Sequence, residues 1–261
     1  MRAIVYDTFG GPDVLHLREF SLPNPGPGQV RVAIYAAGTN PVDASIIARK
    51  PQSLTHVEAA ALPLAAGTAY EMIIRRLALT RGEWVLLYGA AGGVGSLALQ
   101  MAVAQGAHVI AVARARHHAL LSTLGAQACL DYTTHDVLAE AQRIAGRKLD
   151  AVADFVGGET LAQSLAVIRP YGRAASSVGV GGDLDLLLDL NLTLHGILVR
   201  PEQKRLEALV RLVSTGALRP IIDQVLPLEE ATQAHRRLES GHGPGKIVLV
   251  LREETNYFPY A

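Results

Sequence analysis

One uncharged stretch constrains the fold more than any other feature of this sequence. Residues 84–113 contain no Asp, Glu, Lys or Arg, and such a run is long enough to cross a bilayer. Its character changes along its length, however. Residues 84–88 resemble a short apolar strand, 89–95 a glycine turn, 96–105 a helix and 108–113 a second buried strand. This order is typical of a parallel-sheet unit, so the sequence predicts an α/β fold rather than a membrane span.

The chain continues the same alternation after this unit. Further strands are predicted at residues 128–132, 151–156, 173–178 and 192–199. Helices are predicted at residues 67–79, 116–124, 135–144, 159–168 and 201–214. Six strands covered by helices predict a Rossmann-type, doubly wound parallel sheet over residues 54–222, the dinucleotide-binding domain.

The two ends of the chain differ from this pattern. Short strands, separated by Gly- and Pro-rich breaks, are predicted at residues 3–7, 14–20, 29–37 and 246–251. One helix is predicted at residues 228–239. We therefore expect residues 1–53 and 223–261 to meet in a second, smaller β-rich substrate domain.

Composition excludes several classes of protein. The 24 Lys and Arg residues balance the 24 Asp and Glu residues, which argues against a nucleic-acid or anionic-membrane partner. Charged residues make up 18% and hydrophobic residues 49%, so the chain can form a large hydrophobic core and is not mainly disordered. Cys129 is the single cysteine and Met1 to Asp7 do not resemble a signal peptide, so we expect a cytoplasmic protein without disulfides.

The glycine turn predicts a dinucleotide site. It follows a predicted strand and opens a helix, where backbone N–H groups and the helix dipole favour a pyrophosphate. Gly92 and Gly95 fit the second and third glycines of the fingerprint, and Ala90 replaces the first. The candidate contacts are Gly89, Ala90, Gly92, Gly93 and Val94. A glycine turn that serves packing alone is the alternative.

Charge after the next strand distinguishes the two nicotinamide dinucleotides. An NAD site usually places Asp or Glu about 20 residues beyond the glycines. Here the first acidic residue is Asp131, and Arg114 and Arg116 stand where the acid would be. Guanidinium groups suit a 2′-phosphate, so we expect NADPH. The alternative is a solvated, basic start of a helix.

Other catalytic patterns are missing from the sequence. It has no Tyr-x-x-x-Lys, Gly-x-Ser-x-Gly or His-Glu-x-x-His motif, and Gly245-Lys246 lacks the context of a P-loop. Its histidines have no carboxylates at metal-ligand spacing, so we expect no metal.

Several extended motifs resemble one known family. They are residues 1–6 and 10–15, Ala37-Gly-Thr-Asn-Pro-Val-Asp43, residues 57–63 and 67–70, the turn 89–95, and Leu124-Gly-Ala126, Asp154-Phe-Val-Gly-Gly158 and Gly243-Pro-Gly-Lys-Ile-Val248. The chain resembles the medium-chain dehydrogenase/reductases, in their zinc-free quinone oxidoreductase branch. The resemblance implies a Rossmann domain and a chaperonin-like barrel with NADPH between them. Asn40 stands where the zinc branch has a cysteine. The several dozen residues that the family carries between Asp43 and Pro51 are missing, which implies a shortened substrate domain.

Residue roles follow in part from the resemblance. It implies that Val156, Val178 and Gly179 line the cofactor and that Tyr132 lies near the adenosine phosphate. Asn40 is a candidate to hydrogen-bond the substrate oxygen or the nicotinamide ribose, and its alternative is a turn residue before Pro41. Thr68 is a candidate near the nicotinamide, or a packing residue. Lys246 is a candidate for a cofactor phosphate, or a solvated lysine.

The expected activity is zinc-independent, NADPH-dependent reduction of a small-molecule quinone or enone by hydride transfer. The alternative is an NADPH-binding sensor or scaffold with little catalysis, which the shortened domain favours. The predicted strand 192–199 lies last in the sheet and is largely apolar, so we also expect a homodimer through that edge.

Overall fold

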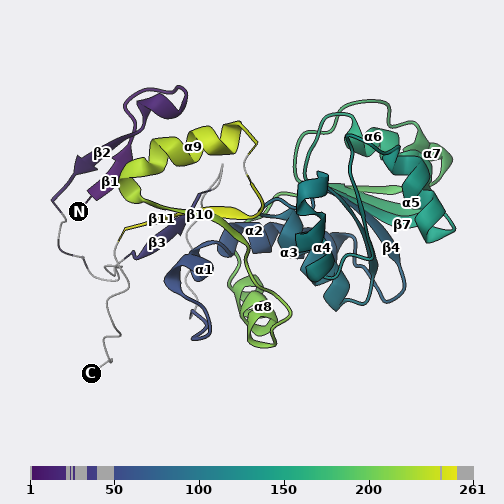
Figure 1. The fold of residues 1–261 in the computed structure, drawn as a ribbon, viewed down its shortest axis with the longest axis horizontal. Coiled ribbons are helices and arrows are strands. Elements are labelled where there is room, and N and C mark those ends of the chain that lie inside the picture. The colour runs from purple at the N-terminus through teal and green to yellow at the C-terminus, as the bar shows by residue number, and fades with distance from the viewer. Residues whose placement is uncertain are drawn as a thin grey trace.

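The larger lobe of the molecule is a Rossmann-type α/β domain. The computed structural model describes residues 2–21, 24, 26, 34–39, 50–241 and 243–251, which form two lobes side by side (Figure 1). Six parallel strands follow the order β6-β5-β4-β7-β8-β9. They are β4 (Trp84–Tyr88), β5 (His108–Val112), β6 (Ala128–Leu130), β7 (Leu149–Asp154), β8 (Ile168–Ser176) and β9 (Thr193–Gly196). The order in which strands are added to the sheet reverses between β4 and β7, and such sheets bind ligands at that point, outside the carboxyl ends of the strands. The predicted fold class is confirmed.

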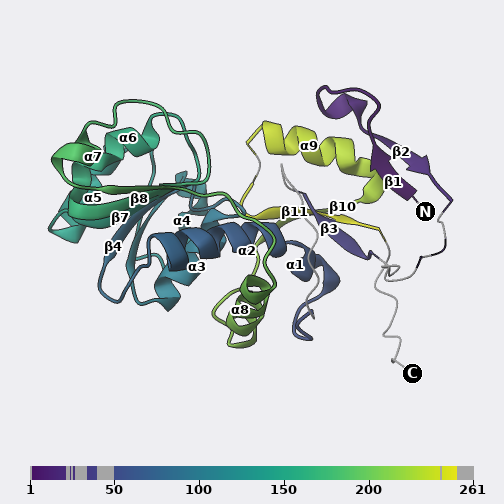
Figure 2. The same cartoon turned by 180° about the vertical axis from the view of Figure 1, so that it is seen from behind.

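Helices cover both faces of this sheet (Figures 1 and 2). Alternate side chains of β4 point to opposite faces, so Val85 and Leu87 belong to one core and Leu86 and Tyr88 to the other. The first core is completed by α2 (Pro63–Tyr70), α3 (Gly95–Ala104), α4 (His118–Thr123) and α8 (Gln203–Ser214). The second is completed by α5 (Val137–Ala145), α6 (Thr160–Ser164) and α7 (Leu186–Asp189).

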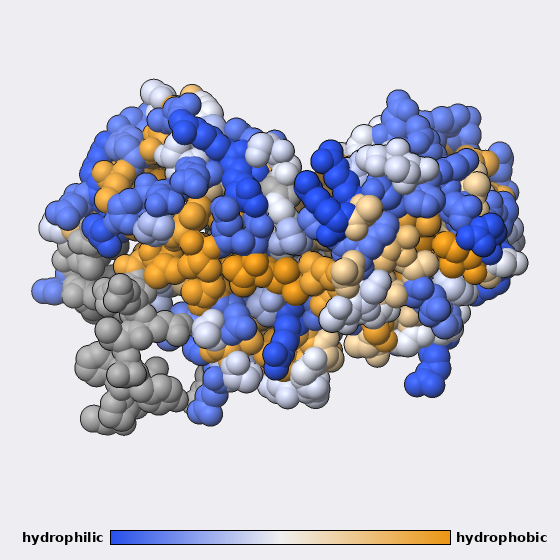
Figure 3. All heavy atoms as spheres, in the orientation of Figure 1, coloured by the Kyte–Doolittle hydropathy of each residue, from blue (hydrophilic) through white to orange (hydrophobic). Residues whose placement is uncertain are grey.

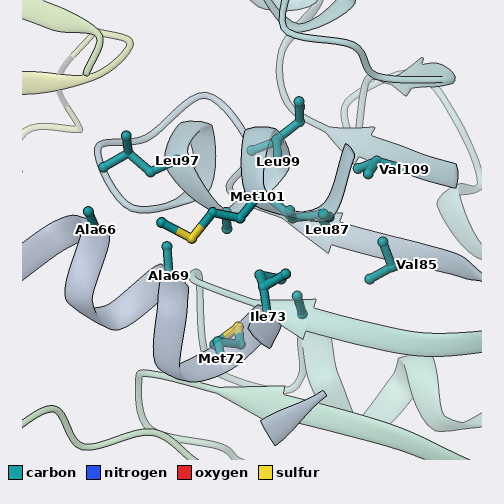
Figure 4. Close-up of a cluster of buried hydrophobic side chains, with 14 of the residues drawn as sticks. Ala66, Ala69, Met72, Ile73, Val85, Leu87, Leu97, Leu99, Met101 and Val109 are labelled. Atoms are coloured by element: carbon teal, nitrogen blue, oxygen red, sulfur yellow. The ribbon is translucent and has the colours of Figure 1, made fainter. Parts of the chain in front are cut away.

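The first core shows why the long uncharged run is needed. Met101 of α3 and Ile73 after α2 are almost completely buried between helices and sheet, together with Val85 and Leu87 (Figure 4). Because strands covered on both faces have no solvated side, their sequence is continuously apolar. Residues 84–113 accordingly form β4, α3 and β5. Within the part of the chain that the structure describes, no helix is long and apolar enough to cross a membrane.

The smaller lobe is built from both ends of the chain. β1 (Arg2–Val5) and β2 (His16–Glu19) form an antiparallel pair. A three-stranded sheet has the order β10-β11-β3, with bounds Ile222–Pro227, Lys246–Val250 and Ala36–Gly38. The helix α9 (Ala231–Glu239) packs on it, and the buried core is small: Leu228, Ala231, Ala234, Ile247 and Leu249. This is the smaller β-rich part that the sequence predicts.

Some elements differ from the predicted ones. β10 was not predicted, because Asp223 and Gln224 interrupt its apolar pattern. The short helix α1 (His56–Ala60) was also missed, although Thr55 and Glu58 form a capping box there. The helix predicted at 67–79 begins earlier, at Pro63, and ends in a π-helical turn, Glu71–Arg76. Part of the strand predicted at 29–37 lies outside the described residues.

Candidate cofactor and active site

The glycine turn between β4 and α3 has a conformation that only glycine tolerates at two points. Gly89 has φ +69°, in the left-handed region, and its carbonyl accepts the N–H of Gly92 at 3.0 Å. A Cβ on Gly95 would overlap that same carbonyl oxygen, so the helix start packs directly on the turn. The N–H of Ala90 donates to the carbonyl of Val112 at 3.2 Å, which fixes the turn beside the end of β5. Ala90 thus serves as well as a glycine would.

Two of the predicted adenosine contacts meet at the ends of β5 and β6. The Arg114 Nε donates to the Tyr132 hydroxyl at 2.9 Å, and both side chains are exposed. Arg116, also exposed, donates from Nε to the His117 Nε2 at 3.0 Å. Arg114 and Tyr132 are therefore in contact, whereas Arg116 is bonded to its neighbour His117. Arg114 and Arg116 follow the end of β5, which the Ala90–Val112 bond joins to the glycine turn.

Asp131 holds this basic loop in place. Its Oδ1 accepts the Thr133 hydroxyl at 2.7 Å and the Thr133 N–H at 2.8 Å, and its Oδ2 accepts the Ala115 N–H at 2.7 Å. These hydrogen bonds lower the pKa of Asp131 to about 2. The carboxylate therefore stays charged and fixes the backbone between the two arginines. Sequence reasoning noted Asp131 only as the first acid and missed this role.

A second buried carboxylate organises the ends of β7 and β8. Asp154 is fully buried, and its Oδ1 accepts the N–H groups of Val156 at 2.9 Å and Gly157 at 3.1 Å. Its Oδ2 accepts the Ser176 hydroxyl at 2.8 Å, and Ser176 Oγ in turn lies 3.3 Å from the N–H of Val178. One side chain thereby holds both loops that carry the predicted nicotinamide contacts.

These loops adjoin the glycine turn. The N–H of Gly158 donates to the carbonyl of Gly179 at 3.1 Å. A Cβ built on Gly89 would lie 3.3 Å from a methyl group of Val156, so the β7 loop touches the turn. Val156 is 60% and Val178 42% exposed, which is unusual for valine and leaves two apolar side chains available to a ligand.

Lys246 joins the lobes rather than standing in solvent. It is buried, its ammonium group donates to the carbonyl of Thr39 at 2.6 Å, and a Cβ on Gly93 would overlap its side chain. The adjacent Gly245 donates its N–H to Ala91 at 2.9 Å. Figure 3 shows the hollow between the lobes, with hydrophilic side chains on both walls. The alternative that Lys246 is a solvated lysine is therefore excluded. Gly93 must be small because the Lys246 side chain packs directly against it.

The two candidate catalytic residues have different outcomes. Asn40 lies outside the described residues, and its role stays a prediction. Thr68 is half-buried on α2, and its hydroxyl donates to the carbonyl of Leu64 at 2.9 Å. That bond within the helix is typical of a packing threonine, and it leaves only the lone pairs of the oxygen for a ligand.

The arrangement fits a dinucleotide. Residues 92–94 are only partly buried, so a phosphate can approach the turn that leads into α3. The N–H groups of Ser96 and Leu97 already donate to the carbonyls of Gly92 and Val94 at 2.9 and 3.1 Å, so a phosphate would meet the N–H groups before them. Ser96 Oγ is buried there without a hydrogen-bond partner among the described residues. Sequence reasoning missed Ser96, although a hydroxyl directly after the last glycine was visible. The described residues contain no cluster of three His, Cys, Asp or Glu side chains suited to a metal.

Comparisons with known proteins agree with this geometry. Residues 124–249 match the family described as zinc-binding dehydrogenase. The chain is 32% identical over 235 residues to the mitochondrial NAD(P)H oxidoreductase RTN4IP1 of Mus musculus, covering 80% of this chain and 59% of that protein. A crystal structure of an NAD-dependent alcohol dehydrogenase superposes with TM-score 0.88 at 27% identity, over 97% of this chain and all of that one. The quinone oxidoreductase of Coxiella burnetii gives TM-score 0.85 at 28% identity, over 97% and 99%.

The chain belongs to the medium-chain dehydrogenase/reductases. As a member of that family it is short, because it spans only 59–62% of the length of the four vertebrate RTN4IP1 proteins it matches. An alignment with the human quinone oxidoreductase, 24% identical, covers 96% of this chain and 98% of the relative. The alignment is 323 positions long, whereas the chain has 261 residues, so dozens of positions of the human protein have no counterpart in this chain. In that alignment nearly all the unmatched positions of the human protein lie between matched segments.

One expectation is wrong. Five of its curated relatives are mitochondrial by name, which contradicts the cytoplasmic location inferred from the single cysteine. The physical reason is that one free thiol excludes an intrachain disulfide in any compartment. It does not distinguish one reducing compartment from another.

Proposed function

We propose that this reductase binds NADPH along the carboxyl ends of its parallel strands and reduces a quinone or an enone. The observation that supports it most is the continuous edge formed by the Arg114–Tyr132 pair, the turn at Gly89 and the Asp154-anchored loops. Phosphate, pyrophosphate and nicotinamide each have a matching partner on that edge. The NAD(P)H and quinone oxidoreductases among its relatives support the same assignment.

Each part of the edge has a separate task in the proposed reaction. NADPH, when bound, supplies the hydride. Arg114 and Arg116 bind its 2′-phosphate with charge-assisted hydrogen bonds, and the start of α3 binds its pyrophosphate. Val156 and Val178 exclude water beside the nicotinamide and orient its ring. The proposal keeps Asn40 as the donor that orients the acceptor oxygen, and a solvent water as the source of the proton.

A paired cofactor titration tests the basic loop. Removing both guanidinium groups in Arg114→Ala/Arg116→Ala should weaken NADPH binding by about 1.5–3 kcal/mol per charged hydrogen bond, and leave NADH binding nearly unchanged. Arg143→Ala is a matched control, because Arg143 is an exposed arginine on α5 that pairs with Glu140. Fluorescence titration of the three proteins with both cofactors measures the effect. Equal losses for NADPH and NADH would refute the assignment.

We also propose that the reaction uses no zinc. The support is Asn40, which stands where the zinc branch of the family has a cysteine ligand, and Cys129, which follows β5 and α4 in the Rossmann lobe. Activity should therefore persist after dialysis against a strong chelator, and elemental analysis should find well under one zinc per chain. Loss of turnover on chelation, restored by added zinc, would contradict this.

A second function has a specific observation in its favour. The alignment with the human quinone oxidoreductase leaves dozens of positions of that protein without a counterpart in this chain. We propose that they belong to the substrate side, because the cofactor edge keeps the Arg114–Tyr132 pair and the loop held by Asp154. Such a protein is suited to bind NADPH as a sensor or scaffold without efficient catalysis. A turnover screen with quinones and enones at saturating NADPH separates the two functions. Tight binding without turnover of any acceptor would favour the sensor.

A further inference from the structure

His117 lies in the basic loop that follows β5, directly after Arg116. The Arg116 Nε donates to its Nε2 at 3.0 Å, and only an unprotonated Nε2 can accept that bond. In this arrangement His117 is neutral, and the guanidinium group of Arg116 is held against the imidazole ring. Arg114, two residues earlier, is held instead by the Tyr132 hydroxyl, to which its Nε donates at 2.9 Å.

The charges around His117 come from both lobes. Arg116, Arg114 and His118 act on it from its own segment, and Asp223 of β10 acts on it from the smaller lobe. Asp223 is bound by Arg237 of α9 at 2.8 and 3.1 Å, so its negative charge is largely compensated. Burial and the two arginines together lower the pKa of His117 below the ordinary value of histidine. The ring is therefore mostly neutral at neutral pH when no anion is bound.

We propose that His117 is a proton-linked specificity residue, which takes up a proton when a 2′-phosphate binds between it and the two arginines. The inference rests on the proposed NADPH function and deepens it. A protonated His117 can no longer accept from Arg116, so protonation releases that guanidinium group towards the phosphate and adds a third positive charge. NADH carries no 2′-phosphate, and its binding leaves His117 neutral.

The sign of the pH dependence follows from linkage. A bound phosphate dianion favours the charged imidazole, so the pKa of His117 is higher in the NADPH complex than in the free protein. The preference for NADPH over NADH is then greatest at mildly acidic pH and is lost as pH rises through the pKa of the complex. Each unit of pKa difference corresponds to about a tenfold change in the affinity ratio. The 2′-phosphate itself takes up a proton near about pH 6, and this loss of negative charge weakens NADPH binding at lower pH.

The test compares wild type with His117→Gln, since the glutamine amide oxygen still accepts from Arg116 and does not titrate. Dissociation constants for NADPH, NADH and adenosine 2′,5′-bisphosphate are measured between about pH 6 and 8. Calorimetry in two buffers of different ionisation enthalpy counts the protons taken up. In wild type the NADPH to NADH affinity ratio should rise at least about threefold towards lower pH, as expected for about half a pKa unit. Proton uptake should accompany both phosphorylated ligands but not NADH.

In His117→Gln the phosphate of the ligand still titrates. The rise of the NADPH to NADH affinity ratio towards lower pH should disappear, and so should the proton uptake that exceeds the contribution of the phosphate. His16→Asn is the matched control, because His16 also lies between an arginine, Arg18 at 2.9 Å, and a carboxylate, Asp7 at 3.3 Å, but on the β1–β2 pair. It should behave as wild type. Tight NADPH binding with the same pH profile in wild type and His117→Gln would overturn this inference alone. No NADPH binding at any pH would overturn the proposed function and this inference with it.

Discussion

At the scale of single residues, Asp154 determines more of the candidate site than any residue that touches the ligand in our proposal. It is fully buried and accepts three hydrogen bonds, from Val156, Gly157 and Ser176. The two loops that it joins follow strands β7 and β8, which are adjacent in the sheet. A carboxylate at the end of one strand can therefore fix the loop of the next. Asp154 is a positioning residue, and its loss should affect geometry before chemistry.

Replacing Asp154 by Ala should leave the N–H groups of Val156 and Gly157 without their acceptor, at a cost of about 1–3 kcal/mol for each buried group. The Ser176 hydroxyl can still donate to the carbonyl of Val178, 3.1 Å away. We expect a lower free energy of unfolding in urea and faster amide hydrogen exchange at Val156, Gly157 and Val178. Glu140→Ala, which removes a partly exposed carboxylate from α5, is the control. Unchanged exchange at these three amides in Asp154→Ala would contradict the positioning role.

At the scale of elements, the edge strand β9 is where a second copy is expected. It has four residues rather than the predicted eight, and it lies at the edge of the sheet as predicted. Leu188 and Leu198, on either side of it in sequence, are 82% and 78% exposed. The N–H of Ile197 donates to the carbonyl of Ser176 at 2.8 Å, so it points into the sheet. Donors alternate along a strand, and the N–H of Gly196 therefore faces outward.

The dimer prediction needs a substitution at the outward position. Gly196→Pro removes an outward donor and should convert a micromolar dimer into a monomer with little change in Tm. Ile197→Pro removes an internal ladder bond and should lower the Tm of the protomer itself. Sedimentation velocity and thermal unfolding of both variants distinguish these effects. A wild-type protein that sediments as a monomer at micromolar concentration would show that the edge is not an interface.

At the scale of the whole molecule, the two lobes are unequal in size and in completeness. The Rossmann lobe has two extensive buried clusters, whereas among the described residues of the smaller lobe the buried cluster has five members. We propose that residues 54–222 form the cofactor domain and that residues 1–53 and 223–261 form the substrate domain. A substrate domain that lacks part of its chain encloses the acceptor less, and hydride transfer loses part of the benefit of excluded water and close positioning.

This architecture favours large flat acceptors. Multi-ring quinones can stack on an exposed nicotinamide, whereas small enones need an enclosing wall. Steady-state kinetics should therefore give a lower KM for multi-ring quinones than for small enones, with slow turnover of both. The same series with saturating NADPH and a single-turnover measurement separates poor binding from slow hydride transfer. Fast turnover with a strong preference for a small enone would contradict an open cleft.

The parts of this protein that its sequence determined are those set by neighbours along the chain. Continuous apolar runs predicted strands covered on both faces, and the glycine spacing after residue 88 predicted a turn that opens a helix. Arg114 and Arg116 could be named as candidate 2′-phosphate ligands because they directly follow a predicted strand, and that role stays a prediction. β10 escaped because two polar residues break its pattern, and its place is fixed by pairing with β11.

Only the tertiary structure decided which distant groups share one environment. Lys246 looks like an ordinary strand lysine, yet its ammonium group bonds to Thr39, 207 residues away. Asp154 and Ser176 belong to separate strands, and Asp223 acts on His117 from the other lobe. Burial and electrostatic interaction depend on distance in space, whereas local sequence pattern reports only neighbours along the chain. The sequence therefore determined the strands, the glycine turn and the basic segment after β5, and the tertiary structure decided which side chains are buried and which groups surround them.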